Sequence, residues 1–215
     1  MSNNEKNFSG IYAVVVTPFK KDGSFDLEAA KRHLDWLSEN GIKGVCLLGA
    51  TGEYQSITNK EHIDYITLTK GLLAAGLIGV FIAEQATFAA EVAGCQAECG
   101  AGSAMAAAAV VQMMGGSVAQ CVDAASMAMQ SITGLVCDPV ANRVEVPCLG
   151  KNIMGGVNAI AAASMILAGY DKVIPLDETI LAMYDIGQKL PQELRCTFGG
   201  LGKTKTSCEL CKRLG

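Results

Sequence analysis

The chain has 215 residues, half of them apolar and 24 of them glycine, a composition typical of a globular protein and not of a disordered one. Its formal net charge of −4 and isoelectric point near 5.2 argue against nucleic acid as a partner, because nucleic-acid binding needs a basic surface. The longest apolar run, residues 71–83, is shorter than the about 20 residues that a membrane span needs. We therefore expect a soluble chain without a membrane partner.

Nine cysteines are the most unusual feature of the composition. The chain starts with the polar sequence MSNNEKNFSG, which does not have the apolar stretch of a secretory signal, so we expect a cytoplasmic location and reduced thiols. In that compartment a rich set of cysteines indicates metal binding or catalysis before disulfides. Cys46 and Cys121 fit a plainer interpretation, as small buried apolar side chains.

The charge density changes near residue 68. Residues 1–68 carry seven Lys/Arg and nine Asp/Glu, whereas the longer stretch 69–150 carries only eight charged side chains and is rich in Ala, Gly and Met. Such a shift predicts two parts with different packing, residues 1–68 and residues 69–215.

In the first part, strands and helices are expected to alternate. Residues 11–16 form an apolar, β-rich run that predicts a buried parallel strand, and residues 45–48 predict a second one. Between them Asp26 is placed to cap a helix that Gly41 ends. Thr58 and Glu61 form a capping box for another helix, expected to run to about Leu68.

The second part is expected to be mostly helical. Alanine and methionine favour helix, and the β-branched alternation of strands is missing from residues 104–114, 117–132, 157–167 and 177–189. The cysteine-bearing loop CDPVANRVEVPCLGKN lies between the second and third of these helices. The predicted fold class is therefore α+β, with a mostly helical C-terminal domain after a short β-α-β-α N-terminal segment.

Three stretches of the first part, GIYAVVVTPFKKDGSFD, WLSENGIKG and GATGEYQSIT, resemble the start of the dihydrodipicolinate synthase and N-acetylneuraminate lyase family over about residues 8–66. That family forms (β/α)8 barrels, so the resemblance implies a partial TIM-barrel-like segment. It also implies an alternative function, a pyruvate-dependent Schiff-base aldolase or synthase in which Thr51 of the loop 49–53 would bind the pyruvate carboxylate. Nothing after residue 68 resembles the later barrel strands that carry the family's lysine and tyrosine. A non-catalytic fusion of two incomplete domains is the third possibility.

The second part resembles the alpha chain of iron–sulfur L-serine dehydratase, over about residues 69–215. The stretches that carry the resemblance are GCQAE, MGG, GLVCDPVANRVEVPCLGKN and LRCTFGGLGKTKTS. It implies a lyase that converts L-serine to pyruvate and ammonia, with a place in gluconeogenesis. It also implies a beta-type partner subunit or a homo-oligomer.

The same resemblance implies a [4Fe–4S] cofactor whose ligands are Cys95, Cys137 and Cys148. Three thiolates can hold three irons and leave the fourth open as a Lewis acid for the serine hydroxyl. Lys151 and Asn152 follow the third ligand and are predicted to reach the substrate. The sequence assigns no catalytic base.

Cys99, four residues after Cys95, fits either a competing ligand or a thiol of a helix core. Cys208 and Cys211 form a C-x-x-C pair in a polar tail, where we expect no role. Residues 198–204, FGGLGKT, resemble a phosphate-binding loop, but a Walker A motif needs glycine where Thr197 stands and has a strand before it. We therefore expect no nucleotide binding.

Overall fold

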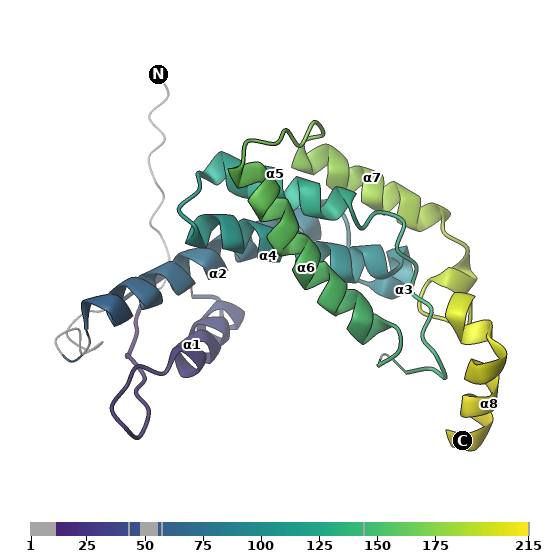
Figure 1. Cartoon of the computed structure of the whole chain (residues 1–215), viewed down its shortest axis with the longest axis horizontal. Coiled ribbons are helices and arrows are strands. Elements are labelled where there is room, and N and C mark those ends of the chain that lie inside the picture. Colours follow the sequence, from purple (N-terminus) through teal and green to yellow (C-terminus); the bar gives the residue numbers. More distant parts are fainter. Residues whose placement is uncertain (1–11, 43, 48–55, 57, 144, 215) are drawn as a thin grey trace. The chain divides into compact units, whose positions relative to one another are not determined.

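The structure is a computed structural model that describes residues 12–42, 44–47, 56, 58–143 and 145–214. The chain divides into two compact units, residues 1–69 and 70–215 (Figure 1).

The first unit contains a two-stranded parallel sheet. Strand β1 (Tyr12–Val14) pairs with β2 (Gly44–Cys46), and helix α1 (Leu27–Glu39) connects them. The Asp26 carboxylate accepts the Ala29 N–H at 2.9 Å, so the predicted helix cap is confirmed. The β-α-β order is therefore as expected, but the partial TIM-barrel architecture is not confirmed, since the sheet has two strands among the residues described here.

Among the described residues of the first unit, the sheet is covered on one face only. Val15 is buried at 1% exposure, whereas its neighbour Val14 is 54% exposed. Cys46 lies directly opposite Val14 in the sheet and shares its open face, so Cys46 is exposed. The expectation that Cys46 is a small buried residue is wrong, because the strand is not covered on both sides as in a fully buried parallel sheet.

Helix α2 (Asn59–Gln85) begins in the first unit and continues into the second. Thr58 and Glu61 exchange the hydrogen bonds of the predicted capping box at its start. The helix does not end near Leu68 but continues to Gln85, because the sequence between these residues contains no proline and packing of the helix outweighs the cost of its three internal glycines. By length and composition alone α2 is the one helix in the described residues that meets the requirement for a membrane span; this is weak evidence, because a core helix passes the same test.

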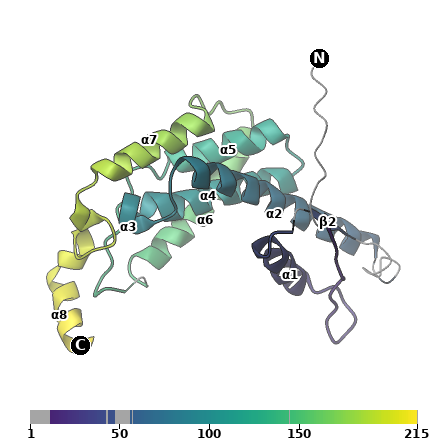
Figure 2. The ribbon, with the colours of Figure 1, turned by 180° about the vertical axis from the view of Figure 1, so that it is seen from behind.

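The second unit is a helical bundle around α4 (Cys95–Met113). Helices α5 (Val118–Gln130) and α6 (Cys148–Leu167) pack on α4, and α7 (Leu176–Lys189) lies beside α5 (Figures 1 and 2). The short helix α3 (Ala90–Ala93) precedes α4. After α7 come the 3-10 turns η3 (Gln192–Leu194) and η4 (Gly200–Lys203) and the last helix α8 (Lys205–Leu214).

Small side chains set how closely the bundle helices pack. Most of the core residues of α4 and α5 are alanines, which allow two helix backbones to approach each other. At one such place the Ser103 hydroxyl of α4 donates to the Gly155 carbonyl of α6 at 2.7 Å. Alanine at Gly155 would bring its Cβ 3.4 Å from the Cys99 carbonyl. The relative position of α4 and α6 is therefore closely defined.

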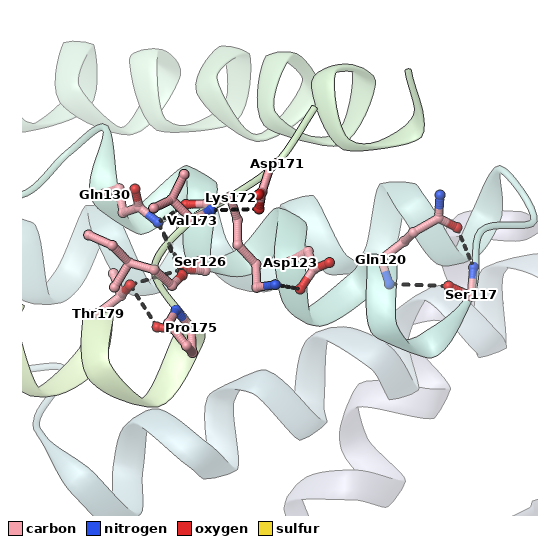
Figure 3. A network of polar contacts seen from close by, with 11 residues as sticks. Ser117, Gln120, Asp123, Ser126, Gln130, Asp171, Lys172, Val173, Pro175 and Thr179 are labelled. Atoms are coloured by element: carbon pink, nitrogen blue, oxygen red, sulfur yellow. Dashed lines mark hydrogen bonds and ion pairs between the residues drawn. The ribbon is translucent and has the colours of Figure 1, made fainter. Parts of the chain in front are cut away.

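A polar network joins α5 to the segment that leads into α7 (Figure 3). The Ser126 hydroxyl donates to the Ile174 carbonyl at 2.7 Å and lies 2.9 Å from the Thr179 hydroxyl. At the surface Lys172 pairs with Asp123 at 3.0 Å. These contacts fix α7 on α5.

All four predicted helices of the second part are present, but two of them begin earlier than expected. The sequence predicted starts at residues 104 and 157, whereas α4 begins at Cys95 and α6 at Cys148. Glycines in these first turns suggested loops, yet each helix continues through them. Packing of a buried helix face outweighs the about 1 kcal/mol that an internal glycine costs.

Candidate metal centre

Three buried thiols come together in the second unit. The sulfurs of Cys95, Cys137 and Cys148 all lie within 4.8 Å of one another, and those of Cys95 and Cys148 are 4.0 Å apart. Their side chains are 0%, 2% and 4% exposed. The residues come from segments up to 53 positions apart in the chain, so the bundle creates the cluster.

Two of the three thiols stand at helix starts. Cys95 is the first residue of α4 and Cys148 is the first residue of α6, while Cys137 lies in the loop between α5 and α6. The sequence predicted loops for all three. The difference matters chemically, because the partial positive charge at a helix N-terminus stabilises a thiolate.

Gln96 fixes the start of α4 to the chain that leads to Cys137. Its side chain is fully buried, and its amide donates to the Ala93 and Met183 carbonyls at 2.9 and 3.0 Å. Its oxygen accepts the Gly134 N–H at 2.8 Å. One side chain therefore connects α3, α7 and the segment before Cys137. No role for Gln96 was predicted from the sequence, although a neutral polar residue directly after Cys95 was a usable signal.

Cys137 is held by the segment that follows α7. Its N–H donates to the Leu194 carbonyl at 2.8 Å, and its carbonyl accepts the Cys196 N–H at 2.9 Å. The next residue, Asp138, is buried and accepts the Leu201 N–H at 2.9 Å. The FGGLGKT stretch is therefore packed against the loop that carries Cys137.

Glycine makes this approach possible. Gly200 has φ +48°, and a Cβ at this position would lie 2.5 Å from the Asp138 carboxylate. A Cβ at Gly202 would lie 2.8 Å from the Pro139 carbonyl. These glycines therefore allow two backbone segments to pack closely. That packing accounts for the glycine-rich stretch 198–204, so no bound phosphate is needed to explain it.

Lys151 connects α6 to the same loop. Its ammonium donates to Asp138 Oδ1 and to the Val136 carbonyl, both at 2.6 Å. Burial disfavours the charged lysine, but the Asp138 hydrogen bond and the nearby Cys95 sulfur outweigh this and raise the pKa of Lys151 above its ordinary value. The predicted substrate contact of Lys151 stays a prediction, and in this structure the ammonium already has two acceptors.

Asn152, the second predicted substrate residue, is exposed and lies one turn of α6 after Cys148. Its Oδ1 accepts the thiol of Cys99 at 3.3 Å. The amide nitrogen makes no hydrogen bond within the described part of the chain. A substrate role for Asn152 stays a prediction.

The three thiols favour their protonated forms. Burial raises the pKa of Cys137 and of Cys148. A hydrogen bond with Cys99, followed by burial, raises the pKa of Cys95, and the same bond lowers the pKa of Cys99. Metal binding at this site would therefore release protons.

The donor set restricts the metals that fit. Three soft sulfurs come together, and both histidines of the chain, His33 and His62, belong to the first unit. Thiolates without oxygen ligands suit an iron–sulfur cluster or zinc and do not suit magnesium or calcium. The residues present therefore fit the implied cluster.

An apolar groove of about 350 Å³ lies elsewhere in the unit, between α2, the end of α4 and α5. Its lining includes Leu73, Leu77 and Val118, with Lys70 as its one charged residue. Its titratable lining residues are Lys70 and Cys121, and it contains none of the three clustered thiols.

The comparison with protein families identifies the chain. Residues 37–201 match the family model described as serine dehydratase alpha chain. The chain belongs to the serine dehydratase alpha chain family. The match begins inside the segment 1–68, so the family resemblance extends further toward the N-terminus than the sequence analysis expected.

Several relatives support the assignment. The chain is 43% identical over 168 residues to the L-serine dehydratase alpha chain of Peptoniphilus asaccharolyticus, covering 78% of this chain and 55% of that one. It is 49% identical over 144 residues to a probable L-serine dehydratase alpha chain of Bacillus subtilis, covering 66% and 48%. A probable L-serine dehydratase alpha chain of Latilactobacillus sakei is 46% identical over 155 residues, covering 72% and 74%. The chain thus spans about half the length of the first two relatives.

The structure tests some of the remaining predictions from the sequence and leaves others untested. Thr51 and the loop 49–53 lie outside the described residues, and the comparisons do not show the resemblance to the dihydrodipicolinate synthase family, which stays a prediction. Cys121 is buried in α5 as expected. Cys208 and Cys211 lie on α8, where Cys208 is exposed and Cys211 is partly buried.

Proposed function

We propose that this chain holds a [4Fe–4S] cluster on Cys95, Cys137 and Cys148 and takes part in the dehydration and deamination of L-serine to pyruvate and ammonia. The observation that carries the proposal is the buried group of three thiols, which come from three separate segments and have no disulfide among them. The membership of the serine dehydratase family supports the choice of reaction.

A bound cluster would supply a Lewis-acidic iron for the hydroxyl that leaves the substrate. The protein's contribution is to hold and shield the three sulfurs. The thiols are favoured in their protonated forms, and the partial positive charge at the N-termini of α4 and α6, together with the Lys151 ammonium, would offset part of this preference when Cys95 and Cys148 bind a metal as thiolates. Gln96 and Asp138 fix the two chain segments that carry Cys95 and Cys137.

Asn152 is the side chain best placed to contact the substrate. It is exposed beside the thiols, and its amide nitrogen is available to donate to a carboxylate. In this proposal Lys151 holds Asp138 and balances the negative charge of the sulfurs. A beta-type subunit completes the active site, as the name alpha chain of the relatives suggests.

The test is the metal and sulfide content of the full chain after anaerobic purification and reconstitution. We expect a brown protein with about four irons and four sulfides per chain. Cys137→Ser should lose most of this content, and Cys121→Ser, which changes a buried thiol of α5, should keep it. Zinc without sulfide, or unchanged content in Cys137→Ser, would contradict the ligand assignment.

The reaction is tested separately. The reconstituted chain is incubated with L-serine, alone and with the beta subunit of a two-chain relative, and pyruvate is measured. We expect pyruvate in the mixture and none from Cys137→Ser. If the cluster is present but no pyruvate forms, with or without the beta subunit, the proposed reaction is refuted while the proposed metal centre is still supported.

A further inference from the structure

One side of α6 faces away from the bundle and is apolar along the whole helix. The other side packs on α4 and α5, and Figure 1 shows α6 crossing α4. We call the solvent-facing side the outer face of α6, and its large apolar side chains are 38% to 63% exposed: Leu149, Ile153, Met154, Val157, Ile160 and Met165. Apart from the two methionines, these residues recur at intervals of four, four and three positions, which places them on one side of a helix.

The outer face also carries no charge among residues 148–167 of α6, all of which the structure describes. Lys151 is the one charged residue of this helix, and its side chain is 13% exposed and paired with Asp138. On α7, by contrast, the exposed Leu181 has exposed aspartates one turn before and one turn after it, Asp177 and Asp185. Charged and polar residues normally occupy the water-facing side of a helix. The outer face of α6 therefore has the composition of a buried surface.

Two glycines leave this face open to close approach. Gly150 and Gly156 are exposed, and a Cβ at either position would meet no atom within 4 Å. Gly155 is different, because a Cβ there would lie 3.4 Å from the Cys99 carbonyl of α4. Each exposed glycine costs the helix about 1 kcal/mol relative to alanine, and no contact within the described part of the unit requires it. Glycine at these positions leaves room for the backbone of another segment.

The composition of the face and the length of the relatives together indicate what covers it. Obligate interfaces are strongly apolar and resemble a domain core cut in half, whereas transient contacts keep about the polarity of the remaining surface. The chain matches 55% of the Peptoniphilus asaccharolyticus alpha chain and 48% of the Bacillus subtilis one. About half of each relative therefore lies outside the match but belongs to the same polypeptide. A core-like face fits a segment of that kind better than it fits a separate beta-type subunit.

We propose that the outer face of α6 binds the part of a serine dehydratase alpha chain that lies outside the match, supplied by a second polypeptide. The bound segment presents an apolar, uncharged face of its own, and its backbone approaches α6 at Gly150 and Gly156. Since α6 begins at Cys148, the segment also lies next to the proposed metal centre. The inference rests on the family membership and not on the cluster, so it and the proposed function can fail independently.

Co-expression of the full chain, carrying an affinity tag, with the unmatched part of the Bacillus subtilis alpha chain tests the proposal. We expect the two polypeptides to co-purify in equal amounts. Val157→Lys and Ile160→Lys place an unpaired charge on the covered face and should each reduce capture at least about tenfold. Leu181→Lys is the matched control, because it changes a 52% exposed side chain of α7, and it should capture as much as the parent. Circular dichroism checks that each variant keeps the helix content of the parent.

The matched part of the Bacillus subtilis alpha chain, tagged in the same way, shows whether the segment binds as a separate polypeptide. Capture by that part and not by this chain would overturn the proposal, and so would capture by neither. A dimer of the full chain that Val157→Lys dissociates, measured by light scattering, would show that a second copy covers the face instead. A beta subunit that the parent captures and Val157→Lys does not would equally refute the assigned occupant.

Discussion

The Lys151 ammonium lies 2.6 Å from the Asp138 carboxylate, and both side chains are largely buried, at 13% and 6% exposure. The pair connects the first turn of α6 to the residue after Cys137. Since Cys148 begins that turn, one ion pair fixes the distance between two of the proposed ligands.

We expect Lys151→Met to lower the free energy of unfolding by about 3–5 kcal/mol, because it leaves the buried Asp138 charge without a partner. Chemical denaturation followed by far-UV circular dichroism measures the loss. Lys189→Met is the matched control, since the Lys189–Asp185 pair is 72% and 61% exposed. It should change stability by less than about 1 kcal/mol. Equal losses in the two variants would contradict the importance of the buried pair.

The same pair predicts a dependence on alkaline pH. The folded protein raises the pKa of Lys151 above its unfolded value of about 10.4, so this stabilisation is complete below that pH and is lost as the pH rises through the folded pKa. The stability difference between the parent and Lys151→Met should therefore be constant from pH 8 to 9 and smaller at pH 11. If the stability difference between the parent and Lys151→Met grows as the pH rises, the pKa of Lys151 is not raised on folding.

Gln96→Leu should lower the free energy of unfolding by about 1–3 kcal/mol, because it removes the Gln96 amide from the buried Ala93 and Met183 carbonyls and the acceptor of the Gly134 N–H. We also expect lower iron content after reconstitution, since Gln96 fixes the residue next to Cys95. Thermal unfolding and iron analysis measure the two effects. Gln188→Leu is the control, because the exposed Gln188 donates only a long bond of 3.4 Å to Val92. Its effect should stay within about 0.5 kcal/mol.

Alanine substitutions at two glycines should have opposite signs. Gly200→Ala places a Cβ 2.5 Å from the Asp138 carboxylate at φ +48°, and we expect a loss of about 1–3 kcal/mol. Gly102→Ala meets no atom within 4 Å inside α4, so the better helix propensity of alanine should stabilise the chain by about 0.5–1 kcal/mol. Denaturant midpoints measure both. A neutral Gly200→Ala would mean that the segment is not held against Asp138.

Local patterns in the sequence were sufficient to predict the caps and the helices. Asp26 and the Thr58–Glu61 box begin helices as expected, because each cap depends on residues within one turn. The end of α2 was predicted wrongly, since no local stop signal follows Leu68. The burial of Cys46 was also predicted wrongly, because burial depends on what covers the sheet.

The sequence by itself determined the helical character of the second unit, the family resemblance and the three cysteines as candidates. Only the tertiary structure decided that these thiols lie within 4.8 Å of one another, and that Cys95 and Cys148 begin helices. It also revealed Gln96 and the Lys151–Asp138 pair, which hold the segments that carry these thiols. The physical reason is that a metal site depends on distances between segments far apart in the chain, and packing of the helices sets those distances.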